Sequence, residues 1–224
     1  MKTCRIGLHS LVFPTILILF TFQIWTESHI SYLEGMVTII RDNKEISGDF
    51  GTPLFERDRI LTGPDSLAVL EIESRCTLKL KSDTTLVLET AGQSINVSLR
   101  QGGLFSRIKK LLGKEYNVRT GDTVAGVRGT EFFVAFGETI EETPDIWLCV
   151  NEGAVEVALP ATGESLIVRE GEGITIPAGN RLTTPRSYSW TADLNWNIDP
   201  DKGELKDETD LSGAYADLRD FDYD

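Results

Sequence analysis

The stretch "AVLEIESRCTLKLKSDTTLVLETAGQSINVSL", residues 68–99, decides the fold class because apolar and polar residues alternate through four consecutive segments. A period of two is typical of β-strands that bury one face. Turn-forming residues separate the segments, as in "ETAGQ" at 89–93. The side chains expected in the core are Ala68, Leu70, Ile72, Leu78, Leu80, Leu86, Leu88, Ile95, Val97 and Leu99.

The same kind of pattern continues towards the C-terminus. Further strands are expected at "EFFVAF", "IWLCV", "AVEVAL", "SLIVR" and "GITIP", with turn signals such as "PATGE" and "EGEG" between them. About a dozen short strands, spaced about ten residues apart with scarcely any helix, predict a single all-β domain. The pattern does not decide between a sandwich, a jelly roll and a solenoid-like fold.

One segment, "LFSRIKKLLGKEY", has the spacing of a short helix. Leu104, Ile108 and Leu111 recur at helical intervals, and basic residues occupy the other side. It could be a helix that contacts a membrane surface or a partner. It could equally be a short connecting helix or an irregular strand that caps the core, and its shortness favours this second interpretation.

The N-terminus has the layout of an export signal, which we assign to residues 1–28. Lys2 and Arg5 precede an apolar run from Leu11 to Trp25, and small residues precede a cleavage position after Ser28. We expect a mature chain that starts near His29 in the periplasm or outside a bacterial cell. The alternative is an uncleaved anchor, which would then be the chain's contact with the membrane.

The C-terminus, residues 181–224, is expected to be a linker followed by a solvated, mobile acidic tail. The last twenty-six residues contain ten acidic residues against three basic ones. A calcium loop is the alternative, because Asn197, Asp199, Asp201 and Glu208 stand at positions one, three, five and twelve of such a loop. Lys202 occupies the sixth position, where the loop requires glycine, so an acidic linker is favoured.

The composition excludes several classes of function. A formal net charge of -13 argues against a nucleic-acid partner, which would require an excess of basic residues on some face. The two histidines are His9 and His29, so a Ser-His-Asp triad, a Cys-His pair and a multi-histidine zinc site are all excluded from the domain. We therefore expect no enzyme, no cofactor and no metal. A third hypothesis is an enzyme that acts on polysaccharide through two carboxylates, which would need a close Asp/Glu pair in a cleft.

Two cysteines follow the export signal, Cys76 and Cys149. In an exported protein they could form one disulfide. The alternative is a pair of buried free thiols, and "CTLKL" favours it by placing Cys76 on the same face as Leu78 and Leu80.

The strip "NVRTGDTVAGVRGTEFFVAFG", residues 117–137, places Arg128 in an otherwise apolar run with a glycine on either side. Glycine allows a strand to bend sharply or another backbone to approach closely. We interpret Arg128 as an internal clamp, held by carbonyl groups or by the carboxylate of Glu131 or Glu152. Contact with a ligand is the alternative role.

At this strip the sequence resembles the FecR domain family. "GMVTIIR", "RDRILTGPDSLAVLEI", "GGLFSRIKKLLG", "YNVRTGDTVAGVRGTEF", "CVNEGAVEV" and "VREGEG" occur in the family's order and together span residues 35–180. One departure is "TGD" at 120–122, where the family tends to have Thr-Pro, which implies a looser bend. The motif residues are Thr120, Thr123, Ala125, Gly126, Val127, Arg128, Gly129, Thr130, Glu131, Phe132, Glu152 and Gly153.

This resemblance implies a stand-alone exported FecR domain that takes part in protein contacts and signal relay in the cell envelope. The family's namesake also has a cytoplasmic part that handles a sigma factor, and we expect this part to be missing here because only about ten residues precede the apolar run. An envelope protein is the expected partner. The alternative is an envelope protein that binds calcium, a glycan or another small ligand.

Overall fold

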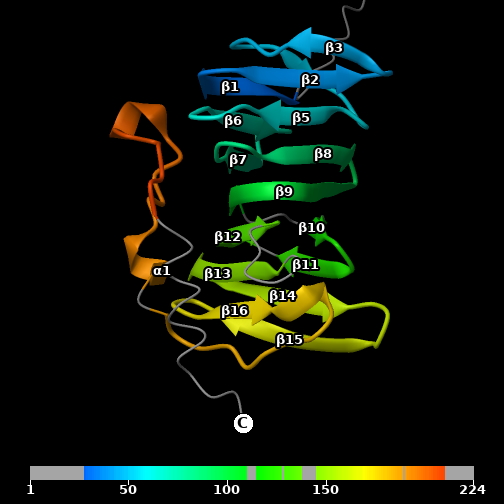
Figure 1. The fold of residues 1–224 in the computed structure, drawn as a ribbon, viewed down its shortest axis with the longest axis vertical. Helices are drawn as coiled ribbons and strands as arrows, with labels where there is room; N and C mark the ends of the chain where they lie inside the picture. The colour runs from blue at the N-terminus through cyan, green and yellow to red at the C-terminus, as the bar shows by residue number, and fades with distance from the viewer. Residues whose placement is uncertain (1–27, 110–114, 128, 138–144, 189, 210–224) are drawn as a thin grey trace, which may run out of the picture.

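The computed structural model of the chain describes residues 28–109, 115–127, 129–137, 145–188 and 190–209. These residues form a tall stack of short β-strands with a separate segment running alongside it (Figure 1). The described residues form sixteen strands, and the α-helix among them, α1, spans only Trp190–Asp193. Within these ranges no helix is long and apolar enough to span a membrane. The all-β fold class expected from the sequence is confirmed.

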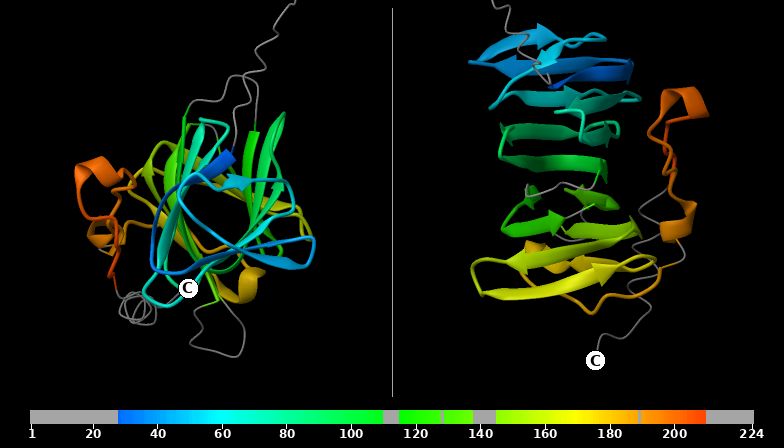
Figure 2. Two further views of the ribbon diagram at one scale, coloured as in Figure 1. Left: turned by 90° about the horizontal axis from the view of Figure 1, so that it is seen from above. Right: turned by 180° about the vertical axis from the view of Figure 1, so that it is seen from behind.

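The strands form two sheets that face each other across the core (Figure 2). Sheet A contains, in spatial order, β4 (Pro53–Leu54), β1 (Ser28–Glu34), β6 (Leu67–Ile72), β7 (Cys76–Leu80), β9 (Ser94–Ile108), β12 (Glu131–Phe136), β13 (Ile146–Glu152) and β16 (Gly173–Ile176). Sheet B contains β3 (Lys44–Ser47), β2 (Val37–Arg41), β5 (Arg59–Thr62), β8 (Thr85–Thr90), β9, β10 (Glu115–Thr120), β11 (Thr123–Val127), β14 (Ala154–Leu159) and β15 (Glu164–Arg169).

The long strand β9 belongs to both sheets. Its first half pairs with β8 and β10 in sheet B, and its second half pairs with β7 and β12 in sheet A. The strand passes from one sheet to the other at Gly102, which has φ +89°. A Cβ at this position would lie 2.6 Å from the Cα atom of Thr84, so only glycine fits.

The main core lies between the two sheets and consists of the inward side chains of both. Every residue that the alternation in 68–99 assigns to the core is buried, with at most 1% of its surface exposed. These predictions are confirmed. The core extends along the whole stack, from Ile30 on β1 to Ile176 on β16.

The structure corrects the helix-like segment. Residues 104–108 belong to β9, with Leu104, Ser106 and Ile108 buried in line with its pairing to β7 and β12. Phe105 and Arg107 lie on the opposite face, so a period of two describes these residues and the helical spacing does not. Residues 110–114 of the same segment lie outside the described part of the chain.

The domain also begins earlier than expected. Residues 28–34 form β1, which pairs with β6 and buries Ile30 completely. The β domain therefore includes residues 28–34, ahead of the expected start at residue 35. Residues 1–27, where the sequence predicts most of an export signal, lie outside the described residues.

Much of the expected tail packs against the domain. Residues 190–209, which we call the strap, run along the outer face of sheet A (Figures 1 and 2). The strap contains α1 and a short 3-10 turn, η2 (Pro200–Lys202), and it buries Leu194, Ile198 and Leu205. A mobile tail is therefore wrong for these residues, because apolar side chains inside the acidic segment fix it to the sheet. Residues 210–224 lie outside the described residues.

Cys76 and Cys149 are both free and buried, so the disulfide alternative is wrong. They point to opposite faces of sheet A, because Cys76 lies in the core between the sheets and Cys149 lies in a second cluster under the strap. Burial raises the pKa of the Cys76 thiol to about 12, and it also raises the pKa of Cys149. A thiol with a raised pKa reacts slowly, because the thiolate is the nucleophile.

We expect iodoacetamide at pH 8 to leave Cys76 and Cys149 unmodified in the folded chain and to modify both after unfolding in urea. Peptide mass spectrometry without prior reduction measures each site separately. Recovery of a peptide in which the two cysteines are cross-linked would contradict this expectation.

Candidate functional site

The motif strip carries the chain from sheet B to sheet A. Strand β11 pairs with β10 and β14 in sheet B, whereas β12 pairs with β9 and β13 in sheet A. The crossing includes Gly129, which has φ +72°, a conformation that favours glycine. Arg128, the expected internal clamp, lies outside the described residues.

A second crossing lies against the first. Gly153, with φ +85°, connects β13 in sheet A to β14 in sheet B. A Cβ on Gly153 would lie 3.0 Å from the carbonyl oxygen of Gly129, so the two crossings touch through their backbones. Between them, the hydroxyl of Thr130 donates to the carbonyl oxygen of Ala154 at 3.0 Å. These three motif residues hold the two crossings together.

The threonines at the start of the motif shape the hairpin between β10 and β11. Thr120 and Thr123 are paired across the turn and both are buried. Gly121, where the family tends to have proline, has φ +57°, which proline cannot adopt. The departure from the family pattern therefore gives a tight hairpin and not the looser bend that we expected.

The remaining motif residues are divided between the core and the surface. Ala125, Val127 and Phe132 are buried between the sheets. Gly126 lies beside the side chain of Asn117, whose Oδ1 would be 3.2 Å from a Cβ at that position. Glu152 is exposed.

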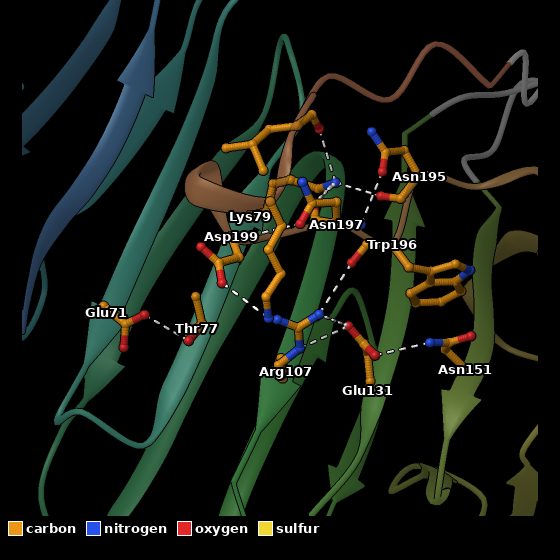
Figure 3. A network of polar contacts seen from close by, with 12 residues as sticks. Glu71, Thr77, Lys79, Arg107, Glu131, Asn151, Asn195, Trp196, Asn197 and Asp199 are labelled. Carbon is orange, nitrogen blue, oxygen red and sulfur yellow. Dashed lines mark hydrogen bonds and ion pairs between the residues drawn. The ribbon is translucent and has the colours of Figure 1, made fainter.

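Glu131 belongs to a polar network on the outer face of sheet A (Figure 3). Its Oε1 accepts hydrogen bonds from Nε and Nη2 of Arg107, at 3.0 and 2.7 Å, and its Oε2 accepts one from Nδ2 of Asn151 at 2.9 Å. Glu131 is only 8% exposed. The carboxylate that we considered as a partner for Arg128 is thus held by Arg107 and Asn151, from the two strands that flank β12.

Lys79 attaches the strap to sheet A. Its ammonium group donates to the carbonyl oxygens of Asn195, Asn197 and Leu205, at 2.6, 2.7 and 3.1 Å. It also lies 4.1 Å from the centre of the Phe105 ring. Three acceptors satisfy the three N–H donors of a lysine that is 1% exposed. Burial lowers the pKa of Lys79 to about 8.

Two further contacts attach the strap on either side of Lys79. Asp207 Oδ2 forms an ion pair of 2.8 Å with Nζ of Lys81, and Asp207 Oδ1 accepts from the backbone N–H of Asn195 at 2.9 Å. Burial opposes ionisation of Asp207, but the Asn195 N–H group and the Lys81 charge outweigh it and lower the carboxyl pKa. On the other side, Arg107 donates to the carbonyl oxygen of Trp196 at 3.4 Å.

A hollow of about 460 Å³ lies where the strap meets the end of β7. Lys81, Gly103 and Phe136 line it from the sheet, and Asp207 and Thr209 line it from the strap. Two of the charged groups that line it, Lys81 and Asp207, form the ion pair just described, so the hollow borders the attachment of the strap.

The residues of the calcium alternative make hydrogen bonds within the strap. Asn197 donates from Nδ2 to the carbonyl oxygen of Gly203, and Asp199 accepts from the backbone N–H of Asp201 at the start of η2. Their side chains therefore fold the strap on itself. Across the described ranges, no three His, Cys, Asp or Glu side chains gather in a way that could hold a metal ion.

Reasoning from the sequence missed Lys79, Lys81, Arg107 and the strap. One signal was available: β12 and β13 are apolar at almost every position, which indicates strands buried on both faces. Strands of that kind require a cover on the outer side of the sheet.

The contact between the crossings can be tested at Gly153. We expect Gly153→Ala to lower the free energy of unfolding by more than the roughly 1–2 kcal/mol of the left-handed backbone alone, because the new Cβ meets the Gly129 carbonyl oxygen. Gly171→Ala is the matched control, since it has φ +79° and nothing within 4 Å of the added Cβ. Urea unfolding measures both variants, and equal losses would contradict the close contact.

The Arg107–Glu131 pair predicts strong coupling. Arg107→Ala should lower stability by about 1–3 kcal/mol, because among the described residues it leaves a mostly buried carboxylate with Asn151 as its remaining side-chain partner. Adding Glu131→Gln should recover part of that loss, since the charge is then removed. Additive losses in the double-mutant cycle, measured by urea unfolding, would show that the pair contributes nothing.

Comparisons with known proteins identify the domain. Residues 58–156 match the family model described as FecR protein. A comparison with curated protein sequences finds no match. Two crystal structures, each of a candidate anti-sigma factor from Parabacteroides distasonis ATCC 8503, are similar in fold.

The first structure is 18% identical, with a TM-score of 0.49, over 58% of this chain and 59% of that chain. The second is 17% identical, with a TM-score of 0.51, over 72% of each chain. This chain thus covers less than two thirds of the first structure. The similarity to the second structure supports a shared fold. The match to the family model shows that the chain carries a FecR domain over residues 58–156.

Proposed function

We propose that this chain is a non-enzymatic module of the bacterial cell envelope that relays a signal through contact with another envelope protein. The observation that carries the proposal is the FecR domain over residues 58–156. Its fold likeness to a candidate anti-sigma factor, at a TM-score of 0.51, is a second support for a role in regulation.

The N-terminal sequence supports an envelope setting. Basic residues followed by the apolar run from Leu11 to Trp25 have the pattern of an export signal. Strand β1 (Ser28–Glu34) follows that run within three residues of Trp25. Cleavage after Ser28 would leave the remainder of β1 in place.

Three buried carboxylates are paired with basic side chains, which supports a binding function and not a catalytic one. Asp58, which is fully buried, is held by Arg41 at 2.7 Å, and Asp207 and Glu131 are held by Lys81 and Arg107. A general acid or base needs a carboxylate that faces a substrate. These three acids are instead occupied in joining elements of the fold.

The test is expression of the full chain in a bacterial host, with a photo-crosslinking amino acid at the exposed positions Arg119 and Glu156 of sheet B and Asn151 of sheet A. We expect the chain in the periplasmic or secreted fraction, with an N-terminus near His29, and a discrete adduct with one envelope protein. The matched control, Leu17→Arg with Leu19→Arg, disrupts the apolar run and should retain the chain inside the cell without the adduct. A cytoplasmic wild-type chain with residues 1–28 intact, or no adduct from any position, would refute the proposal.

A further inference from the structure

The outer face of sheet A forms a surface of apolar and cationic side chains that the strap covers. Cross-strand neighbours on β6, β7, β9, β12 and β13 form its central row, and each of them is at most 1% exposed. Lys81 and Arg107 lie on either side of this row. We call this surface the docking face; its central row is Val69, Lys79, Phe105, Phe133 and Cys149.

The strap is attached to the docking face through side chains of the sheet. Lys79 holds three of its carbonyl oxygens, and Lys81 holds its Asp207. Leu194 and Ile198 pack on the row beside Trp196, whose ring meets Phe105 edge-on at 5.5 Å. The face therefore recognises backbone carbonyl groups, which any peptide has, together with apolar side chains and one carboxylate at a suitable spacing.

The docking face and its cover differ in origin. Every residue of the face lies within 58–156, the range that matches the FecR family, whereas the strap lies wholly outside it. The shared domain thus contains a face that needs a cover, and in this chain a separate segment supplies it. Without a cover, the face would expose an apolar patch together with a lysine that had lost its three acceptors.

We propose that the docking face is a peptide-binding surface, and that the strap is a built-in ligand which competes with an extended segment of the partner protein. That segment would carry apolar side chains next to an acidic residue, to match the row and the cations Lys79, Lys81 and Arg107. This inference rests on the proposed function, because it names the surface through which the module would contact its partner.

Competition of this kind follows from tethering. A ligand on the same chain acts at a high effective concentration, so a free peptide of the same sequence binds poorly while the strap is docked. A partner segment binds when its contacts with the face exceed those of the strap, and the strap is then released. The strap thus sets a threshold for binding.

The test uses the purified full chain and a fluorescent synthetic peptide with the sequence of residues 190–209. In the full chain, Trp196→Ala with Ile198→Ala weakens the strap and leaves the docking face intact. We expect this variant to bind the peptide at least about tenfold more tightly than the wild type does, as measured by fluorescence anisotropy. Ile167→Ala, on the outer face of sheet B, is the control and should leave binding at the wild-type level.

Two changes in the weakened-strap variant test the chemistry of the face. Adding Lys79→Met should abolish peptide binding. Adding Lys81→Gln should reduce peptide binding several-fold, and because Lys81 is partly exposed this change perturbs folding less. A peptide with Asp207→Asn should bind the weakened-strap variant more weakly than the wild-type peptide does. Hydrogen exchange of β7, β9 and β12 confirms that each variant remains folded.

The inference is overturned if the strap of the weakened variant exchanges freely, the sheet stays protected, and the peptide still does not bind. It is also overturned if loosening the strap unfolds sheet A, since the strap would then be an inseparable part of the fold. A wild-type dimer that exchanges straps, detected by light scattering, would make a second copy the ligand in place of another protein. The peptide-binding experiment contains no envelope protein. A negative result in it therefore does not change the outcome of the cellular crosslinking experiment.

Discussion

The passage of β9 from one sheet to the other is the constraint on which the rest of the structure depends. One continuous strand pairs with β8 and β10 in sheet B and then with β7 and β12 in sheet A. The two sheets therefore cannot slide or separate without breaking this strand. Gly102 makes the passage possible, because no other residue fits beside Thr84 with φ +89°. The motif strip, between β11 and β12, is the next crossing from sheet B to sheet A. Gly153, in the crossing from β13 to β14, packs against it.

The sequence predicted those strands and core residues that follow from alternation of apolar and polar residues. In residues 68–99 one face of each strand meets the core and the other carries mostly polar residues, so a period of two identifies the buried set correctly. Residues 104–108 also follow a period of two, but the alternation is hard to see in the sequence because the buried Ser106 is polar and the outward Phe105 is apolar, which leaves Leu104 and Ile108 at a helical spacing. Burial of both faces of sheet A disguised the strand.

The candidate site was less predictable, because it depends on contacts between distant parts of the chain. Lys79 binds carbonyl oxygens more than a hundred residues away, and a lysine between two leucines has no local feature that indicates burial. The strap was hidden for a related reason. Its acidic composition indicates a solvated segment, whereas its few apolar residues and its backbone carbonyl groups are what attach it. Average composition does not detect a segment held by a few well-placed contacts.

Architecture and recognition occupy different parts of this molecule. Most of the described motif residues lie at the crossings or in the core, where glycine backbones and buried side chains fix the sheet order. The cations lie on the outer face of sheet A, where Lys79 and Lys81 hold a segment from outside the family domain. A lysine that becomes buried loses its hydration, and only well-placed hydrogen-bond acceptors replace it. A face built around Lys79 is therefore selective for a chain that presents carbonyl groups there. That requirement can be met by the strap of the same chain or by another extended peptide, and this equivalence is the physical basis for competition at the docking face.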